Sequence, residues 1–281
     1  MLRQLALVSE ASSVSFGDVA RVSAALQKQA ARDFGPVWEV SATVDPFEKL
    51  EDVPIGYWSL IIRDDIGFPG AAGIHLDRDG QPFSLIQTSK DWALTASHEC
   101  LEMLADPFGN RLIAGPAPKE ATGQKRVEFL VEVCDPSEDG RFGYTVNGIA
   151  VSDFYTPHYF DPVTAASVRY SFTGAIKKPR QVLKGGYLSW HDPVSDHWFQ
   201  IQFFGSKPVL ADLGVLARNG RSLREMIDAL TPTSVTVPKV PAANKLMAAA
   251  AAGSASVGTL DSTISRAKTL HAQIQAIIAQ G

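Results

Sequence analysis

The stretch DWALTASHECLEMLADP, residues 91–107, decides the fold of this chain. Its apolar residues recur every three or four positions, which predicts a helix over residues 91–105. The Asp-Pro pair that follows ends this helix, because proline lacks the backbone N–H that a further turn needs. The helix is otherwise apolar, so we expect it to be a buried element.

Three ionisable residues interrupt this apolar helix. His98 and Glu102 are four positions apart, so their side chains lie one turn apart on the same face and can supply two ligands to one metal ion. Glu99 follows the first ligand, in the position from which a zinc-peptidase carboxylate accepts a proton from water at the metal. The motif H-E-x-x-E alone is also typical of a solvated helix face. The apolar surroundings favour the metal site, since buried charges need partners.

A third metal ligand has to come from elsewhere in the chain. Asp106 lies eight residues beyond His98, about 12 Å along a straight helix, which is too far for a shared ion. The segment VEFLVEVC, residues 127–134, predicts a strand with Glu132 on its more polar face. Two acidic residues lie in the turn that follows, where a purely structural role is the alternative. The order of preference is Glu132, Asp135, Glu138, Asp106.

Other polar residues are weaker candidates. Tyr144 and His158 could donate a hydrogen bond to a tetrahedral intermediate, and packing in the aromatic loop 152–160 is the alternative. The remaining histidines are expected to be structural, with His75 in a strand and His191 and His197 beside a hairpin turn.

The nucleophile candidates are less convincing than the metal site. Cys100 is two residues from His98, so it points away from the metal face and into the core. Ser97 has no visible base partner, which disfavours a serine hydrolase. Cys100 and Cys134 are too few for a disulfide framework and suit a reducing compartment, although one bridge between them stays open.

Several elements precede the central helix. A first strand is expected over residues 1–9, and a backing helix over 18–34 that Gly35-Pro36 ends. Strands follow over 37–44 and 57–63. An Asp79-Gly80 turn then joins two strand-like runs into a hairpin, whose glycine and proline content favours the edge of a sheet.

This order of elements resembles the N-terminal subdomain of the zincin metallopeptidases over about residues 1–110. The resemblance implies an α+β fold with a twisted mixed sheet, a backing helix and an active-site helix. It also implies an edge strand that aligns a peptide substrate, which would be residues 71–77 or 83–88. His98, Glu99 and Glu102 carry the motif. The runs SHECLEMLADPFGN, VEVCDPSE and VSDFYTPHYF are similar to a group of uncharacterised bacterial and fungal proteins, which implies no substrate.

The resemblance also implies one divalent metal ion, by preference zinc. Glu102 stands where the zincin motif has its second histidine, and an anionic oxygen there lessens the pull of the metal on bound water. A ligand set of one histidine and two carboxylates also suits Mn²⁺ or Fe²⁺.

The rest of the chain predicts a β-rich C-terminal subdomain over 111–230 that completes the site. It contains a hairpin at Asn147-Gly148, three further strands and a helix over 221–230. A proline- and threonine-rich linker over 231–259 then leads to a C-terminal helix, residues 260–281, which could contact a partner protein. The three further strands are expected near residues 168–172, 186–189 and 198–204.

Composition excludes several classes of protein. Twenty-six Lys and Arg residues stand against 30 Asp and Glu, a formal net charge of −4, which disfavours a nucleic-acid surface. Hydrophobic residues make up 45% of the chain and its mean hydropathy is about zero, as in globular proteins. We expect no signal peptide, no membrane span and a cytoplasmic location.

The sequence therefore predicts a metal-dependent hydrolase, by preference a peptidase with a peptide or protein substrate. Two alternatives stay open. One is a hydrolase that acts on a non-peptide amide or ester at the same site. The other is a non-catalytic, zincin-derived binding or assembly protein, in which the same residues form a buried polar network or an inert metal site.

Overall fold

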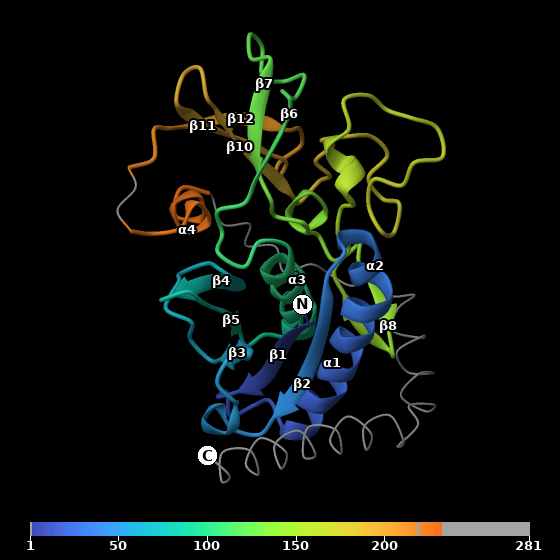
Figure 1. The fold of residues 1–281 in the computed structure, drawn as a ribbon, viewed down its shortest axis with the longest axis vertical. Helices are drawn as coiled ribbons and strands as arrows, with labels where there is room; N and C mark the ends of the chain where they lie inside the picture. Colours follow the sequence, from blue (N-terminus) through green and yellow to red (C-terminus); the bar gives the residue numbers. More distant parts are fainter. Residues whose placement is uncertain (1, 218–219, 232–281) are drawn as a thin grey trace.

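The computed structural model describes residues 2–217 and 220–231 of the 281. They form an α+β structure of two five-stranded sheets, which confirms the expected broad class. In Figure 1 the strands of the first sheet lie beside and below the central helix α3, and the second sheet lies above it. The predicted linker 231–259, apart from Thr231, and the predicted C-terminal helix 260–281 lie outside the described residues.

The first sheet has the strand order β2-β1-β3-β5-β4. Four strands run parallel, and β4 pairs antiparallel with β5 at the edge. The predicted hairpin is confirmed, with Asp79 and Gly80 both at positive φ in its two-residue turn. Of the two segments considered for the edge strand, residues 71–77 overlap β4 at the edge, and residues 83–88 overlap β5 inside the sheet. The strands are β1 (Leu2–Ser9), β2 (Ser41–Phe47), β3 (Trp58–Arg63), β4 (Gly73–Arg78) and β5 (Gln81–Gln87).

The backing helix begins as predicted but does not end at Gly35-Pro36. Helix α1 (Phe16–Lys28) continues through a π-helical segment (Gln29–Phe34) into a short helix, α2 (Gly35–Trp38). The π turn lets Gly35 N–H bond to the carbonyl five residues back, and Pro36 then occupies a first-turn position where no N–H is needed. The strand predicted over 37–44 consequently starts at Ser41.

Helix α3 (Trp92–Ala105) matches the prediction and is buried on most of its surface. Together with α1 it covers one face of the first sheet, where Leu5, Leu7 and Ile62 contribute to the core. The same apolar cluster continues into the second sheet through Phe129 and Trp190. Helix α3 is therefore packed between the two sheets, which explains why it is apolar nearly all round.

The second sheet is antiparallel, in the order β12-β11-β10-β7-β6, and departs from the predictions at several points. The strand predicted over 127–134 ends at Leu130, and its pairing with β10 covers only Glu128 and Phe129. β6 and β12 were not predicted. The strands are β6 (Leu112–Pro116), β7 (Arg126–Leu130), β10 (Tyr187–Asp192), β11 (His197–Gln202) and β12 (Val209–Gly214).

Three smaller elements complete the described chain. The hairpin predicted at Asn147-Gly148 is present as β8 (Tyr144–Val146) and β9 (Ile149–Val151). The strand predicted over 168–172 is wrong, since this stretch makes only an isolated bridge between Tyr155 and Ser171. Helix α4 (Leu223–Asp228) is shorter than the predicted 221–230.

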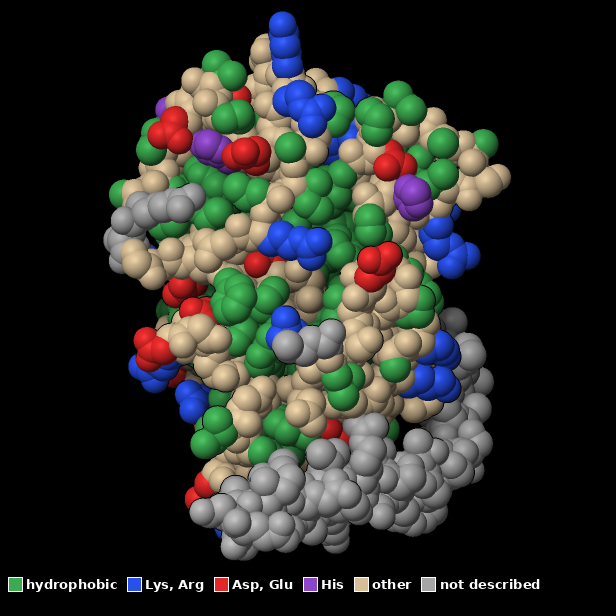
Figure 2. Space-filling model, in the orientation of Figure 1, with side chains coloured by type: hydrophobic (Ala, Val, Ile, Leu, Met, Phe, Trp, Pro, Cys, Tyr) green, Lys and Arg blue, Asp and Glu red, His purple; other side chains and the backbone are tan. Residues whose placement is uncertain are grey.

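The surface does not gather charge of one sign on the face drawn in Figure 2, where acidic and basic side chains are interspersed. Among the described residues, no helix combines the length and the apolarity that crossing a membrane requires. The mixed surface charge agrees with the composition, whose positive and negative residues nearly balance.

Replacing Gly35 tests the junction between the π turn and α2. A Cβ at Gly35 would lie 2.6 Å from the carbonyl oxygen of Val40 and 2.9 Å from that of Ala30, both rigid backbone atoms. We expect Gly35→Ala to lower the free energy of unfolding by about 1–3 kcal/mol, as overpacking does. Urea denaturation measures this change. Gly17→Ala is the control, because its Cβ would meet only Ser15 Oγ at 3.7 Å, and an equal loss there would contradict the steric explanation.

Candidate metal centre

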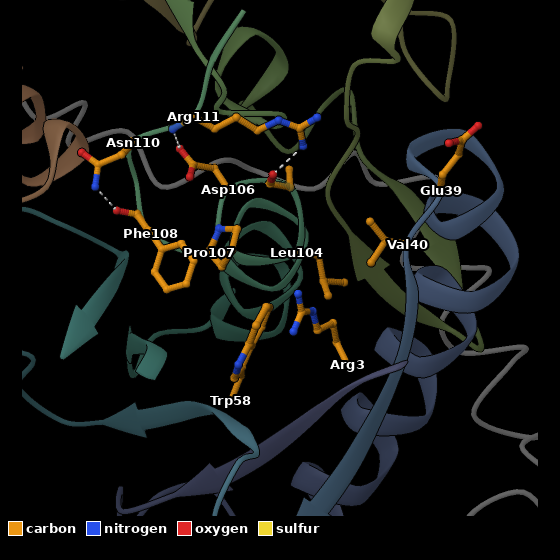
Figure 3. A pocket seen from close by; sticks show the side chains of 11 residues that line it. Arg3, Glu39, Val40, Trp58, Leu104, Asp106, Pro107, Phe108, Asn110 and Arg111 are labelled. Carbon is orange, nitrogen blue, oxygen red and sulfur yellow. Dashed lines mark hydrogen bonds between the residues drawn. The ribbon is translucent and has the colours of Figure 1, made fainter. Parts of the chain in front are cut away.

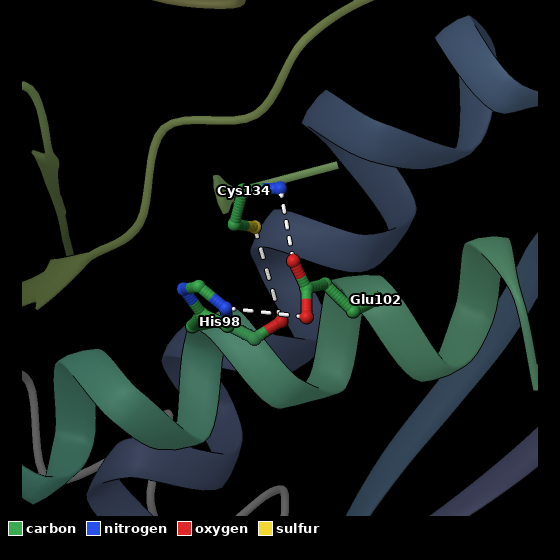
Figure 4. A group of neighbouring side chains, drawn as sticks. All are labelled: His98, Glu102 and Cys134. Carbon is green, nitrogen blue, oxygen red and sulfur yellow. Dashed lines mark hydrogen bonds and ion pairs between the residues drawn. The ribbon is translucent and has the colours of Figure 1, made fainter. Parts of the chain in front are cut away.

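The first part of the site is one turn of α3. His98 Nε2 lies 3.2 Å from Glu102 Oε2, as the four-residue spacing predicts. Glu102 is fully buried, whereas the side chain of His98 keeps 12% of its surface exposed. Figure 4 shows the two side chains side by side on α3, with Cys134 opposite them on a different segment.

The second part is the segment that leaves the sheet after β7. Asp135 Oδ1 lies 3.2 Å from His98 Nε2, and Cys134 N–H donates to Glu102 Oε1 over 3.2 Å. Carboxylate oxygens of Glu102, Glu132 and Asp135 all lie within 4.8 Å of one another. Helix α3 and this segment thus bring one imidazole and three carboxylates together, which is a donor set that suits a divalent cation.

The structure separates the four acidic residues considered as the third ligand. Glu132 and Asp135, the first two in order, lie in the cluster. Glu138 lies close enough for its pKa to respond to His98 and Glu102, but it belongs to none of the ligand groups. Asp106 caps the turn after α3, where its Oδ2 accepts from Arg111 N–H. Asp106 thus has a structural role of its own and belongs to none of the ligand groups.

Glu99 faces the edge strand rather than solvent. A Cβ on Gly73 of β4 would lie 2.8 Å from Glu99 Oε1, so Glu99 packs against the strand backbone where that residue has no side chain. Its other oxygen, Oε2, is buried without a hydrogen bond and lies 3.6 Å from His75 Nδ1. His75 therefore borders the site, a placement that the sequence analysis missed. Strand alternation was the available signal, because Ile74 packs on the opposite face.

Arg224 is the second residue that the sequence analysis missed. It projects from α4, its side chain is only 4% exposed, and its Nη1 donates to Glu102 Oε2 over 2.5 Å. It also contacts Glu132 and lies 3.2 Å from Asp228. Nothing in the local sequence distinguishes it from a surface arginine, since only the tertiary fold carries α4 to this cluster. A permanent cation thus already lies against part of the acidic group.

Burial and mutual charge shift the pKa values across the cluster. Burial opposes charge on His98, yet Glu102 and Asp135 outweigh it and raise the pKa of His98 well above its usual value. Burial, followed by the charge of Glu102, raises the pKa of Asp135 well above normal. Burial raises the pKa of Glu138 to about 7. Burial works against ionisation of Glu102 too, but Arg224 and His98 hold the pKa of this carboxyl below its usual value.

The cluster carries more acidic groups than positive ones. Six carboxyl groups face one guanidinium and two imidazoles, so protons or a bound cation must balance the remainder. Several of their atoms are buried without a hydrogen bond, which is the state that a ligated cation would relieve. The six are Glu99, Glu102, Glu132, Asp135, Glu138, Asp228. The atoms without a hydrogen bond include His75 Nδ1, Glu99 Oε2, Glu132 Oε1, Asp135 Oδ1 and Asp135 Oδ2.

Two residues considered for the reaction are not brought to this cluster. Tyr144 lies on β8 beside α1, and its hydroxyl donates to Asp33 Oδ2 over 2.8 Å. His158 is exposed and pairs with Asp161, 2.9 Å away. Among the described residues, neither makes a hydrogen bond or ion pair with the cluster.

Among the described residues, Cys100, His191 and His197 have structural positions. Cys100 and Cys134 are both free and buried, so no bridge joins them, and burial raises the pKa of Cys100 to about 12. Cys134 borders the metal cluster, where its thiol sulfur lies within ligand range of His98 and Glu102. His191 and His197 lie on β10 and β11 and pair with acidic neighbours.

A pocket of about 560 Å³ lies at the C-terminal end of α3. Figure 3 shows Trp58 and Arg3 below the pocket, Phe108 to its left and Arg111 above it. None of the ligand groups described above lines this pocket. The chemistry of the site is therefore assigned to the buried cluster rather than to the pocket.

Comparisons of the chain with known proteins find no matching family model, no matching curated protein and no matching solved structure. The likeness to zincins therefore stands on the motif and on the order of elements alone.

Removing Arg224 tests how the acidic cluster is balanced. In metal-free protein, Arg224→Gln leaves buried carboxylates without their permanent cation, so we expect the free energy of unfolding to fall by about 3–5 kcal/mol. Urea denaturation of chelator-treated protein measures it. Arg126→Gln, an exposed position on β7, is the control. A loss no larger than that of the control would show that Arg224 is not needed for charge balance.

Proposed function

We propose that this protein is a metal-dependent hydrolase with a zincin-like catalytic subdomain, by preference a peptidase. The observation that carries the proposal is that His98 Nε2 lies 3.2 Å from both Glu102 Oε2 and Asp135 Oδ1, two carboxylates that also form a buried group with Glu132. Asp135 Oδ1 faces His98 at 3.2 Å, while Asp135 Oδ2 is buried without a hydrogen bond, which favours a further cation at this point. Glu132 is available as an additional ligand.

The first sheet supports the zincin-like assignment. Its parallel strands, antiparallel edge strand and following helix match the element order that the resemblance implies. In this arrangement β4, which pairs only with β5 among the described strands, would align a peptide along its free edge. Such a peptide would pass near Glu99, which packs against Gly73 of the same strand.

The residues divide the chemistry between them. His98, Glu102 and Asp135 would hold a divalent ion, by preference zinc, with Mn²⁺ or Fe²⁺ as alternatives. The ion would polarise a substrate carbonyl and lower the pKa of a water molecule. Glu99 would accept the proton of that water and pass it to the leaving amine. Cys134 N–H orients Glu102 through its other oxygen, as an outer hydrogen bond orients a ligand.

A second candidate function is a non-catalytic binding or assembly protein. The observation that favours it is Arg224, whose guanidinium already contacts Glu102 and Glu132 in place of a metal. In that case the cluster is a buried ionic network that fixes α4 against α3. A hydrolase of non-peptide amides or esters would share the metal site and differ in its substrate.

Metal analysis separates the enzyme from the scaffold. After loading with ZnCl₂ and dialysis, we expect about one tightly bound zinc per chain, because a site with three protein ligands holds zinc firmly. Asp135→Asn and Glu102→Ala should lose this ion, whereas Glu128→Gln, whose carboxylate pairs with His191 on the second sheet, should keep it. A folded wild-type protein without metal would favour the scaffold.

Replacing the assigned base tests the reaction itself. With fluorescein-labelled casein as the probe, we expect Glu99→Gln to lower hydrolysis by about 10²–10⁴-fold, the usual contribution of a general base. Its zinc content, measured by elemental analysis, should stay unchanged. Glu128→Gln is again the matched control. Full activity of Glu99→Gln with zinc bound would overturn the role of this residue.

A further inference from the structure

His75 is placed as metal-binding histidines are placed. It lies on β4 with its side chain turned toward α3 and only 1% exposed. Its Nε2 lies 3.0 Å from the carbonyl oxygen of Asp106. Because a carbonyl can only accept, Nε2 donates in this hydrogen bond, and Nδ1 is the nitrogen that offers a lone pair to a metal ion when the ring is neutral. Ligating histidines commonly donate their other N–H to a backbone carbonyl, which fixes the tautomer and the ring orientation.

The free nitrogen of His75 faces two acidic side chains. Nδ1 makes no hydrogen bond and lies 3.6 Å from Glu99 Oε2 and 4.0 Å from Glu102 Oε2. A lone pair opposite two buried carboxylates is repelled unless a positive species lies between them. The donors of a tetrahedral zinc ion stand about 3.4 Å apart, given zinc–ligand distances near 2.1 Å. Small side-chain movements would bring these three atoms to that spacing.

We propose that His75 Nδ1, Glu99 and Glu102 form a second divalent-cation site beside the first, with Glu102 shared between the two. The sharing follows from one atom, because Glu102 Oε2 lies 3.2 Å from His98 Nε2 and 4.0 Å from His75 Nδ1. A carboxylate between two cations is a recurrent arrangement in hydrolytic sites with two metals. The ligands suit Zn²⁺ or Mn²⁺, which accept nitrogen and oxygen donors together.

Arg224 makes the second site the weaker one. Its Nη1 contacts Glu102, and its Nη2 lies 3.9 Å from Glu99 Oε2, so a second cation has to displace the guanidinium. The second ion is therefore taken up only when metal is in excess. The effect on activity rests on the proposed function, in which Glu99 is the general base. Because an ion in the second site would bind Glu99 as a ligand, its occupation inhibits hydrolysis.

Metal titration of the full chain tests the second site. Protein stripped with EDTA and dialysed is titrated with ZnCl₂ by calorimetry, with equilibrium dialysis for the stoichiometry. We expect two ions per chain, the second at least tenfold weaker. In His75→Gln the side-chain amide can still donate to the Asp106 carbonyl from the place of Nε2, but nothing replaces Nδ1. This variant should bind only the first ion, and Arg224→Gln should tighten the second.

Matched variants separate the two sites. Asp135→Asn should lose the first ion and keep the second, the reverse of His75→Gln. If His75→Gln does not fold, as judged by circular dichroism, Glu99→Gln serves instead, because a neutral amide is a poor metal ligand. One ion in both the wild type and His75→Gln overturns the second site and leaves the proposed function standing. If the wild type binds one ion, which His75→Gln loses and Asp135→Asn keeps, the second site is supported and the first is overturned. If the wild type binds no zinc, both sites are overturned.

Discussion

The carboxylate of Glu102 is the constraint on which the rest of the structure depends. It is fully buried in the middle of α3, and an isolated carboxylate there would cost far more free energy than a single domain has to spare. Its two oxygens are met by Cys134 N–H, His98 and Arg224, which come from three different elements. The carboxylate of Glu102 therefore links both the segment after β7 and helix α4 to α3.

This constraint also explains the path of the chain between the two sheets. A regular β7 would continue to Cys134 and keep its backbone in the ladder with β10. Instead the strand ends at Leu130, and Cys134 in the segment that follows donates its N–H to Glu102 on α3. This segment also places Glu132 and Asp135 beside Glu102. The chain gives up regular strand pairing here, and ionisable groups come together instead. Such breaks in regular secondary structure are typical of functional sites.

The sequence predicts the local parts of this site well and the tertiary parts poorly. Helix α3 and the facing of His98 and Glu102 follow from a period of 3.6 residues, and the hairpin before them follows from Asp79-Gly80. The position of Arg224 does not follow, because α4 reaches the cluster only through the fold of more than a hundred intervening residues. His75 is an intermediate case, since its strand was foreseen but not the helix that its ring faces.

Charge balance connects the architecture to the choice between an enzyme and a scaffold. A network closed by Arg224 and His98 would satisfy Glu102 and Asp135 Oδ1 but would leave Asp135 Oδ2 buried without a hydrogen bond. Burial raises the pKa values of Asp135, Glu138 and Asp228, and the charge of Glu102 adds to each shift. A divalent ion beside His98 would replace the protons on these groups and supply a partner for Asp135 Oδ2. Two interpretations of the cluster are therefore unequal. A metal centre with Arg224 at its border is better supported than an ionic network that Arg224 completes.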